Sequence, residues 1–493
     1  MIYNFNLGIG WASSGVEYAQ VYRARMFRNI GVDAKFVFTD MFPSENIEHM
    51  TKNIGFLDSE VIWLYTFFTD FKTAPVTYTL SDLETTFTDL NYTKKREGKI
   101  CRYVFGGSNN FYTAYMVNNQ DDFVHRVELV SNGFLIRKDY FTYGRVYSEY
   151  YAPLDNKAHL YHRRFFNENG SVAYEEIIDD DRVMYKFKDK ILCSKEEFVG
   201  YMVSQLHLTK DDVVLIDRST DIGQSILMNC KPARVGTVVH ADHFSEKDTN
   251  EDYILWNNYY EYEFNMHKHI DFYICSTQAQ SGLMIQQFEK YYGMTPCVYT
   301  IPVGSLPELK YPKEGRKPFS LITASRLASE KHVDWICKAV IQARREVPEL
   351  SLDIYGVGGE REKLETIIRD NNASDYIHLM GQHDLSEVYQ NYEAYIAGST
   401  SEGFGLTLME AVGGGLPIVG FDVRYGNPTF IRNGENGYLI SLPEEDKDKI
   451  EALRKGIVDL FKQDLGKCHE VSYEVAKDFL TCNVQEKWRE AVC

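Results

Sequence analysis

The sequence predicts an α/β protein with two domains built on parallel sheets and an antiparallel sheet inserted into the first of them. Apolar, strand-like runs alternate with amphipathic helices up to about residue 75 and again from residue 206, a pattern typical of parallel sheets with helical crossovers. Between residues 77 and 205, Tyr and Phe become dense, the apolar pattern has period two and hairpin turns occur. This middle part therefore indicates an antiparallel meander.

A polar segment with two prolines, residues 311–318, is typical of an interdomain linker. We therefore expect the first α/β domain at residues 1–76 and 206–312, the meander at 77–205 and the second α/β domain at 313–475. Residues 476–493 are expected to form a helix that packs back on the first domain.

The elements follow in order from their patterns. The first domain begins with a strand, a helix and two further strands, expected at residues 3–7, 15–30, 34–38 and 61–65. After the insertion, the continuous apolar runs typical of buried parallel strands are at residues 213–217, 235–239 and 272–275. The strands of the second domain are expected at residues 319–324, 352–355, 377–380, 395–397 and 417–420, with helices between them. The charged tail from about residue 444 is expected to be helical.

Hairpin turns define the meander. Asn132-Gly133 separates β-rich runs at residues 123–129 and 134–141, and Asn-Gly in that position is a strong hairpin signal. Asp179-Asp180-Asp181 resembles the Asp-x-Asp metal ligands of some sugar transferases, but a solvated hairpin turn is the better interpretation. The aromatic faces of the meander are candidates for contact with a partner or a membrane.

Composition excludes several classes of protein. The chain has 493 residues and a net charge of −18, which argues against a nucleic-acid groove. Its nine Cys are scattered without a Cys-x-x-Cys pair, as expected of reduced thiols rather than disulfides or a zinc site. The apolar run at residues 61–68 is far shorter than the roughly 20 residues that span a bilayer. We expect a soluble, cytoplasmic protein.

Two carboxylates flank a glycine-rich turn in the second domain. Glu402 lies in the turn Ser399–Gly405, and Glu410 lies eight positions later on the helix that the turn opens, before Gly413-Gly414-Gly415 ends it. Backbone N–H groups at such a helix start favour a phosphate or a sugar hydroxyl. The two carboxylates are suited to different hydroxyls of one elongated ligand, although an acidic cap and a solvated Glu are the simpler alternative.

Other residues at strand ends extend this picture. Ser14, Gly15, Val16 and Glu17 follow the first strand and open the first helix, where open α/β folds bind ligands. Arg326 and Lys331 follow the first strand of the second domain and are suited to a diphosphate.

Two further segments allow alternative interpretations. Gly356-Val357-Gly358-Gly359 fails the dinucleotide pattern because Arg361 occupies the third glycine position, so a tight turn is expected. His240-Ala241-Asp242-His243 ends a strand, and contact of His240 with a sugar hydroxyl is favoured over a metal site, because no further ligand cluster is evident.

In the second domain these motifs, in this order, resemble those of the retaining family-four glycosyltransferases of GT-B fold. The resemblance includes Arg326 with Lys331, Gly381-Gln382-His383-Asp384 before Val388-Tyr389, and Glu402-Gly403-Phe404-Gly405 with Glu410. The segment at residues 9–18 and the meander are similar to a narrower group. That group comprises catalytic subunits that place the first N-acetylglucosamine on Ser and Thr of serine-rich repeat adhesins in accessory secretion.

The resemblance implies two Rossmann-like domains facing a cleft that binds UDP-N-acetylglucosamine. It implies that Gln382, His383 and Asp384 contact uracil, and that Glu410 contacts the ribose. It places Arg326 and Lys331 at the diphosphate, helped by N–H groups near Gly15 and at Gly405–Leu406. It assigns His240, Glu402, Gly403 and Phe404 to the sugar, without a metal or other cofactor.

The expected partners are a related non-catalytic subunit and a Ser/Thr-rich protein acceptor, with peripheral contact at the inner face of the cell membrane left open. Three alternatives also remain open: UDP-glucose as the donor, a lipid or polysaccharide acceptor, and a non-catalytic sugar-binding subunit.

Overall fold

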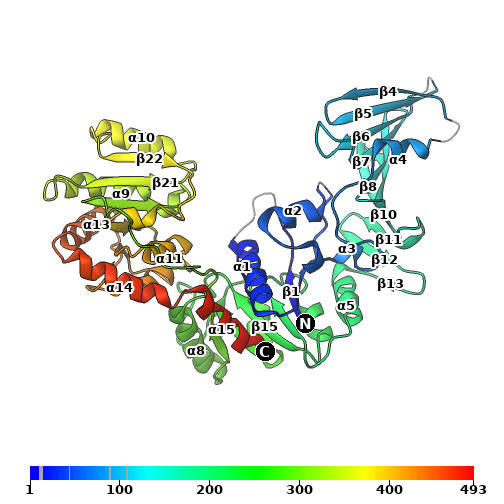
Figure 1. The fold of residues 1–493 in the computed structure, drawn as a ribbon. Helices are drawn as coiled ribbons and strands as arrows, with labels where there is room; N and C mark the ends of the chain where they lie inside the picture. Colours follow the sequence, from blue (N-terminus) through cyan, green and yellow to red (C-terminus); the bar gives the residue numbers. More distant parts are fainter. Residues whose placement is uncertain (10–14, 44, 88–89, 107–108) are drawn as a thin grey trace. The chain divides into compact units, whose positions relative to one another are not determined.

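The computed structural model describes residues 1–9, 15–43, 45–87, 90–106 and 109–493 (Figure 1). By their contacts the residues form two units. Unit 1 comprises Met1–Ala24, Val32–Thr237 and Trp256–Asp271. Unit 2 comprises Arg25–Gly31, Val238–Leu255 and Phe272–Cys493.

Unit 1 contains a parallel sheet with the strand order β15-β14-β1-β2-β3, of which β15 crosses into unit 2 at its end. These strands are β1 Ile2–Asn6, β2 Ala34–Phe38, β3 Val61–Trp63, β14 Val213–Ile216 and β15 Arg234–Val239. The helices are α1 Gly15–Ile30, α2 Ile47–Ile54, α3 Leu64–Phe67, α4 Leu80–Thr85, α5 Lys195–Gln205, α6 Gly223–Asn229 and α7 Glu261–Asn265, with the end of α1 in unit 2. The parallel sheet expected from the alternating pattern is confirmed.

One expected strand is too long. The strand predicted at residues 61–65 ends at Trp63, and the helix α3 begins at Leu64. The parallel partner β2 ends at Phe38, opposite Trp63, and the next N–H groups, of Thr39 and Asp40, donate to the carbonyl oxygen of Leu7 instead. Residues beyond Trp63 therefore have no partner strand. The prediction included Leu64 and Tyr65 because they are apolar. Both are buried in α3, so their apolar character does not distinguish a strand from a helix.

The inserted meander is a ten-stranded sheet in which β4 to β13 are neighbours in chain order and their pairs are antiparallel. The strands are β4 Tyr92–Glu97, β5 Ile100–Phe105, β6 Phe111–Met116, β7 Val124–Ser131, β8 Phe134–Phe141, β9 Arg145–Leu154, β10 Lys157–Phe166, β11 Val172–Asp179, β12 Arg182–Lys186 and β13 Ile191–Leu192. Asn132 and Gly133 both have positive φ, of 50° and 84°, as a two-residue hairpin turn with right-handed strand twist requires. Asp179 ends β11 at a turn, so the hairpin interpretation of the acidic run is also confirmed.

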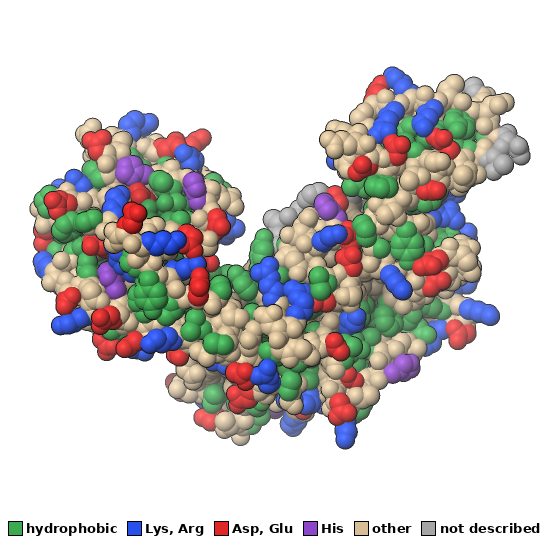
Figure 2. Space-filling view, in the orientation of Figure 1, with side chains coloured by type: hydrophobic (Ala, Val, Ile, Leu, Met, Phe, Trp, Pro, Cys, Tyr) green, Lys and Arg blue, Asp and Glu red, His purple; other side chains and the backbone are tan. Residues whose placement is uncertain are grey.

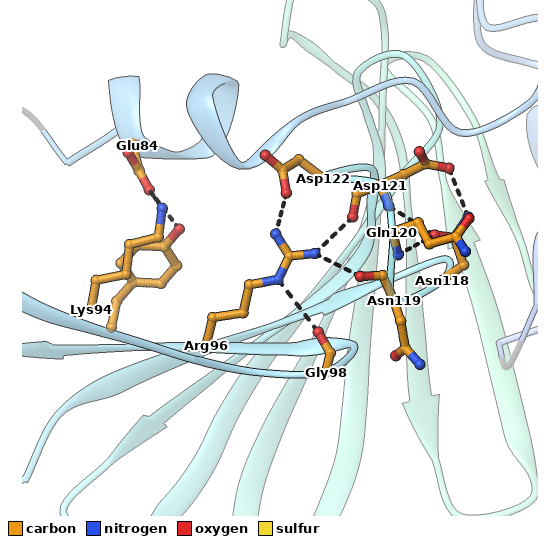
Figure 3. Close-up of polar contacts among 10 residues, drawn as sticks. Glu84, Lys94, Arg96, Gly98, Asn118, Asn119, Gln120, Asp121 and Asp122 are labelled. Carbon is orange, nitrogen blue, oxygen red and sulfur yellow. Dashed lines mark hydrogen bonds and ion pairs between the residues drawn. The ribbon is translucent and has the colours of Figure 1, made fainter.

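Polar contacts tie the far end of the meander together (Figure 3). Arg96 on β4 donates to the carbonyl oxygens of Gly98, Asn119 and Asp121 and to the carboxylate of Asp122. One guanidinium thus holds the β4–β5 turn against the loop between β6 and β7.

Unit 2 contains a six-stranded parallel sheet in the order β22-β21-β20-β23-β24-β25. Its strands are β20 Ser320–Ala324, β21 Ser351–Tyr355, β22 Ile377–Gly381, β23 Ala394–Ile396, β24 Ile418–Phe421 and β25 Gly437–Ile440, each within about one residue of the predicted strand where one was predicted. The parallel pair β18 Phe272–Cys275 and β19 Val298–Thr300 and the short pair β16 Phe244–Ser245 and β17 Leu255–Trp256 complete its strands, β17 ending in unit 1. Its helices are α8 Gln278–Tyr292, α9 Val333–Ala343, α10 Arg361–Asp370, α11 Leu406–Gly413, α12 Gly426–Phe430, α13 Asp446–Leu460, α14 Leu465–Lys477 and α15 Thr481–Val492.

The strands of the six-stranded sheet carry apolar side chains on both faces, so two cores form. Leu321 belongs to the core shared with α9, α10 and α13, whereas its neighbour Ile322 belongs to the core shared with α11 and α14. This sandwich leaves the ends of the strands as the exposed edge where loops collect, which is where open α/β sheets bind ligands.

The visible surface of the described residues carries no concentrated field of positive charge, as expected of a chain in which acidic residues outnumber basic ones (Figure 2). Figure 2 shows Lys and Arg side chains interspersed with Asp and Glu over the visible face rather than gathered in one field. Among the described residues, none of the helices combines the length and the apolar character that crossing a membrane requires.

Candidate active site

The turn that carries Glu402 is fixed through its main chain. The Glu402 N–H donates to the carbonyl oxygen of Arg424 at 3.1 Å, and the Glu402 carbonyl accepts from the N–H groups of Tyr425 at 2.5 Å and Gly426 at 2.7 Å. Gly426 allows this approach, since a Cβ there would lie 2.3 Å from the carbonyl oxygen of Phe404. The side chain of Glu402 is therefore presented from a backbone that two loops hold rigidly.

Lys331 and Glu402 come together, as the sequence predicts for residues at strand ends on one side of the sheet. Lys331 ends a 3-10 turn at Ser329–Lys331, and its Nζ lies 2.6 Å from Glu402 Oε2. Both side chains are about four-fifths buried. Partial burial strengthens this ion pair relative to an exposed one, because water screens the charges less.

Arg326 has a different environment from the one expected. Its side chain is 74% exposed and its guanidinium pairs with Glu330 at 2.7 Å, so it does not join Lys331 and Glu402 in this structure. The loop that carries Arg326 is held closely: Gly356 has a φ of +130°, and a Cβ there would lie 1.9 Å from the carbonyl oxygen of Ser325. The glycines after Tyr355 therefore form the predicted tight turn and support the Arg326 loop.

Glu410 lies on α11 and is largely buried. Tyr389 donates its hydroxyl to Glu410 Oε2 at 3.0 Å. Burial raises the pKa of the Glu410 carboxyl above its ordinary value, the nearby Asp384 charge raises this pKa further, and the hydrogen bond from Tyr389 lowers it. Tyr389 came from the sequence only as part of a motif, and its hydrogen bond with Glu410 is a contact that spacing along the chain does not reveal.

Gln382, His383 and Asp384 form an exposed loop after β22. His383 Nε2 lies 2.8 Å from the carbonyl oxygen of Met380, and its ring packs edge-on against Tyr355 with ring centres 5.8 Å apart. The Asp384 carboxylate accepts from the backbone N–H of Ser386 at 3.0 Å, and this hydrogen bond lowers the Asp384 pKa. The loop has a defined shape and leaves polar groups at the surface.

The segment after β15 reaches the same turn. The carbonyl oxygen of His240 lies 3.8 Å from the position of a Cβ on Gly403. A contact that the sequence analysis did not predict connects the two segments, since His243 Nδ1 lies 3.3 Å from the Tyr425 hydroxyl. His243 is fully buried and its Nε2 lies 2.7 Å from Gln287 Oε1; burial lowers its pKa to about 4, so the ring is neutral. His243 and Tyr425 are 182 positions apart in the chain, so no local sequence pattern could predict their contact.

The remaining predicted residues lie at the start of α1. Ser14 is outside the described residues, and Gly15, Val16 and Glu17 form the first turn of α1. Glu17 is buried and accepts hydrogen bonds from Asn6 and Arg218 at 3.4 and 3.2 Å. Its carboxylate is thus engaged within unit 1. Among the described residues, no group of three or more His, Cys, Asp or Glu has the arrangement of a metal site.

Comparison with known proteins places these features in a family. Residues 93–189 match the GtfA extended beta-sheet domain, and residues 309–477 match glycosyl transferases group 1. The GtfA subunit of UDP-N-acetylglucosamine–peptide N-acetylglucosaminyltransferase from Streptococcus agalactiae is 53% identical, over 99% of this chain and 97% of the relative. A crystal structure of a GtfA/B complex covers 100% of this chain and 98% of its own, with a TM-score of 0.96 and 52% identity. The pneumococcal O-GlcNAc transferase GtfA in complex with UDP and GlcNAc gives a TM-score of 0.86 and 50% identity, covering 100% and 98%.

Proposed function

The chain belongs to the family of GtfA subunits of UDP-N-acetylglucosamine–peptide N-acetylglucosaminyltransferases, and from this premise we propose that it transfers N-acetylglucosamine from UDP to hydroxyl groups of a protein. One observation carries the proposal: Lys331 contacts Glu402 beside the N-terminus of α11, the helix that also carries Glu410. A cation from the loop after β20 and the carboxylate that it contacts then lie beside the N–H groups that begin α11, and a second carboxylate lies further along the same helix. A nucleotide sugar, which has a diphosphate between two sets of hydroxyls, matches that order of groups.

In this proposal, different residues bind different parts of the donor. Gln382, His383 and Asp384 contact the uracil, and Glu410 accepts hydrogen bonds from the ribose hydroxyls. Lys331 holds the diphosphate, and Arg326 joins it by leaving Glu330, an exchange that an exposed ion pair allows at little cost.

The sugar end of the donor is assigned to the turn around Glu402. Glu402 and the adjoining turn Gly403–Phe404 bind the N-acetylglucosamine, with His240 from the neighbouring segment. The N–H groups of Gly405 and Leu406 join Lys331 at the diphosphate. Ser14, Gly15, Val16 and Glu17 remain proposed as a second source of contacts to the donor.

The chemistry is departure of UDP. Negative charge grows on the β-phosphate while the anomeric carbon becomes positive, and a fixed cation with helix N–H groups lowers the barrier by stabilising that charge. Lys331 supplies the cation without a metal. The acceptor hydroxyl attacks from the face that UDP leaves and gives its proton to a phosphate oxygen, so the anomeric configuration is retained and Glu402 is not the nucleophile.

The relatives support a partner subunit for this chain. One similar structure is a GtfA/B complex, and we infer that this chain also assembles with a related subunit. We propose Ser/Thr-rich segments of a serine-rich repeat adhesin as the acceptor, and the outer face of the meander as the docking surface for the partner. Peripheral contact with the inner face of the cell membrane is a separate proposal, which flotation with anionic lipid vesicles tests.

A mass-shift assay tests the function. The chain is incubated with and without a related partner subunit, with a Ser/Thr-rich peptide and with UDP-N-acetylglucosamine or UDP-glucose. We expect addition of N-acetylglucosamine to the peptide, with UDP-glucose much less active. Transfer only to a lipid or polysaccharide acceptor would contradict the protein acceptor, and no hydrolysis or transfer from any UDP-sugar would identify a non-catalytic subunit.

A further inference from the structure

The side chain of Tyr389 is buried, and its hydroxyl donates a hydrogen bond to Glu410. Its side chain is 3% exposed and belongs to the core beneath α11. The 3-10 turn Tyr389–Asn391 holds its backbone, and Gly414 at the end of α11 packs so closely that a Cβ there would lie 2.8 Å from the Tyr389 Cβ. The ring therefore cannot swing away, and its hydroxyl is fixed 3.0 Å from Glu410 Oε2.

The two carboxylate oxygens of Glu410 differ in their hydrogen bonding. Oε2 accepts from Tyr389, whereas Oε1 has no hydrogen bond from any of the described residues. A carboxylate on a helix ordinarily rotates about its side-chain torsions, and one buried hydrogen bond to a rigid donor removes that freedom. Oε1 is then held in one direction.

We propose that Tyr389 is a positioning residue for UDP: its hydroxyl fixes the Glu410 carboxylate in the orientation that receives the ribose hydroxyls. The inference rests on the proposed function, because it needs Glu410 to contact the ribose. Tyr389 acts through Glu410 and does not itself contact the donor.

The same hydrogen bond has a consequence for pH. Two groups act on the Glu410 carboxyl in the described part of the chain: Asp384 in the loop after β22 and Tyr389 in the 3-10 turn. Burial and Asp384 raise the Glu410 pKa, and the Tyr389 hydroxyl lowers it. Loss of the hydroxyl therefore raises this pKa further and protonates more of Glu410 as the pH falls. A protonated carboxyl has fewer free lone pairs for two ribose hydroxyls, so binding weakens most at low pH.

Calorimetric titration with UDP on the full chain tests the inference. We expect Tyr389→Phe to weaken UDP binding about tenfold at neutral pH, the size of a hydrogen bond to a charged group. The ratio of the variant and wild-type dissociation constants should grow towards about pH 6 and shrink towards about pH 8.5. Gln at position 410 cannot titrate. In a Glu410→Gln background, the factor by which Tyr389→Phe weakens UDP binding should therefore be independent of pH.

Tyr140→Phe is the matched control. Tyr140 is also a buried tyrosine that donates to a buried carboxylate, with its hydroxyl 2.8 Å from Glu149 Oε2 on the meander. Both variants should lower the melting temperature to a similar extent, but Tyr140→Phe should leave the UDP dissociation constant unchanged. If the ratio of variant to wild-type dissociation constants for UDP were the same for both variants and independent of pH, the proposed role of Tyr389 would be wrong. Failure of the wild-type chain to bind UDP would instead refute the proposed function.

Discussion

Lys331 and Glu402 neutralise each other in the structure, and this pairing bears on how the donor binds. A diphosphate that approaches Lys331 competes with the Glu402 carboxylate for the same ammonium group. Two negative charges beside one cation are unfavourable unless hydroxyl groups of the sugar satisfy the carboxylate. The intact nucleotide sugar supplies both the phosphates and the hydroxyls, so the pair favours the donor over UDP alone.

Replacement of the cation tests this role. Lys331→Ala should lower kcat by roughly 100- to 1,000-fold, as expected when one group that stabilises the transition state is removed. Binding of the peptide acceptor should change little. Lys338→Ala provides the control, since Lys338 also pairs with a carboxylate in unit 2, Asp334 at 3.5 Å. Equal losses in turnover and in acceptor binding would contradict the assignment, as would a similar loss in kcat for the control.

A buried histidine in unit 2 predicts a pH effect on stability. His469 Nε2 lies 2.9 Å from the carbonyl oxygen of Glu393; burial, with a contribution from Arg316, lowers the His469 pKa to about 4. The folded state resists protonation at pH values where the unfolded chain accepts a proton. The stability that neutral His469 contributes is therefore complete above about pH 6.5 and is lost as the pH falls towards about 4, at a cost of roughly 3 kcal/mol.

His469→Gln keeps a donor for the Glu393 carbonyl and removes the titration. The difference in unfolding free energy between wild type and variant should shift by roughly 2 kcal/mol in favour of the variant between about pH 7 and pH 4.5. Denaturation in urea, followed by circular dichroism at each pH, measures this shift. Parallel pH dependences of the two proteins would refute it.

Elements with a local signal were predictable, and contacts between distant elements were not. Asn132-Gly133 specifies its hairpin because its two residues adopt positive φ, a property of those residues alone. The contact between Tyr389 and Glu410 depends instead on where β22, the 3-10 turn and α11 meet. Sequence motifs assigned Lys331 and Glu402 to one site, and the two side chains form an ion pair, but the motifs did not reveal the exposed position of Arg326, which Glu330 holds.

The turn after β21 tests the role of backbone approach in shaping the phosphate side of the site. Gly356→Ala places a Cβ 1.9 Å from the Ser325 carbonyl oxygen at a φ of +130°, so the Arg326 loop must move. We expect a loss of about 2–4 kcal/mol in unfolding free energy and weaker UDP binding. Gly359→Ala is the control, because open space surrounds that position and its effect should stay within about 0.5 kcal/mol. Equal melting temperatures for the two variants would refute the argument.

The turn around Glu402 makes a different prediction, because it supports the sugar rather than the nucleotide. Gly426→Ala brings a Cβ within 2.3 Å of the Phe404 carbonyl oxygen and 2.9 Å of Glu402 Cγ, so the turn must shift. Even a small shift should lower kcat by about 100-fold, whereas UDP affinity should remain within about threefold of wild type. Gly282→Ala on α8, where a Cβ meets no atom within 4 Å, should change neither value. A parallel loss of UDP binding in the Gly426 variant would show that the turn serves the nucleotide.

At the scale of the whole molecule, the alternation of strands and helices predicted both parallel sheets, and the period-two stretch predicted the meander between their parts. Composition set the class of protein, because a chain with a net charge of −18 lacks the basic field of a nucleic-acid groove. The surface that binds a partner has no such compositional signal. It depends on which strands lie side by side and which apolar side chains point outwards.

Ile177 and Met184 show this dependence. They face each other across β11 and β12, and their side chains are 38% and 37% exposed. An exposed apolar pair on a sheet face is suited to docking. Ile177→Lys combined with Met184→Glu keeps an attractive cross-strand pair and adds no net charge, so the sheet should remain folded. We expect this double variant to weaken assembly with the related subunit at least tenfold, while its hydrolysis of UDP-N-acetylglucosamine alone stays unchanged.

Size-exclusion chromatography with light scattering, at several concentrations of the two subunits, measures the assembly. Leu442→Lys is the control, because Leu442 is an apolar residue of unit 2 with a similar exposure of 39%. A polar substitution there should leave the complex intact if the meander is the docking surface. Loss of the complex in the Leu442 variant, with normal assembly of the Ile177/Met184 variant, would place the interface on unit 2. In that case the exposed face of the meander would be left for the acceptor, and the two variants should then differ in transfer to the peptide.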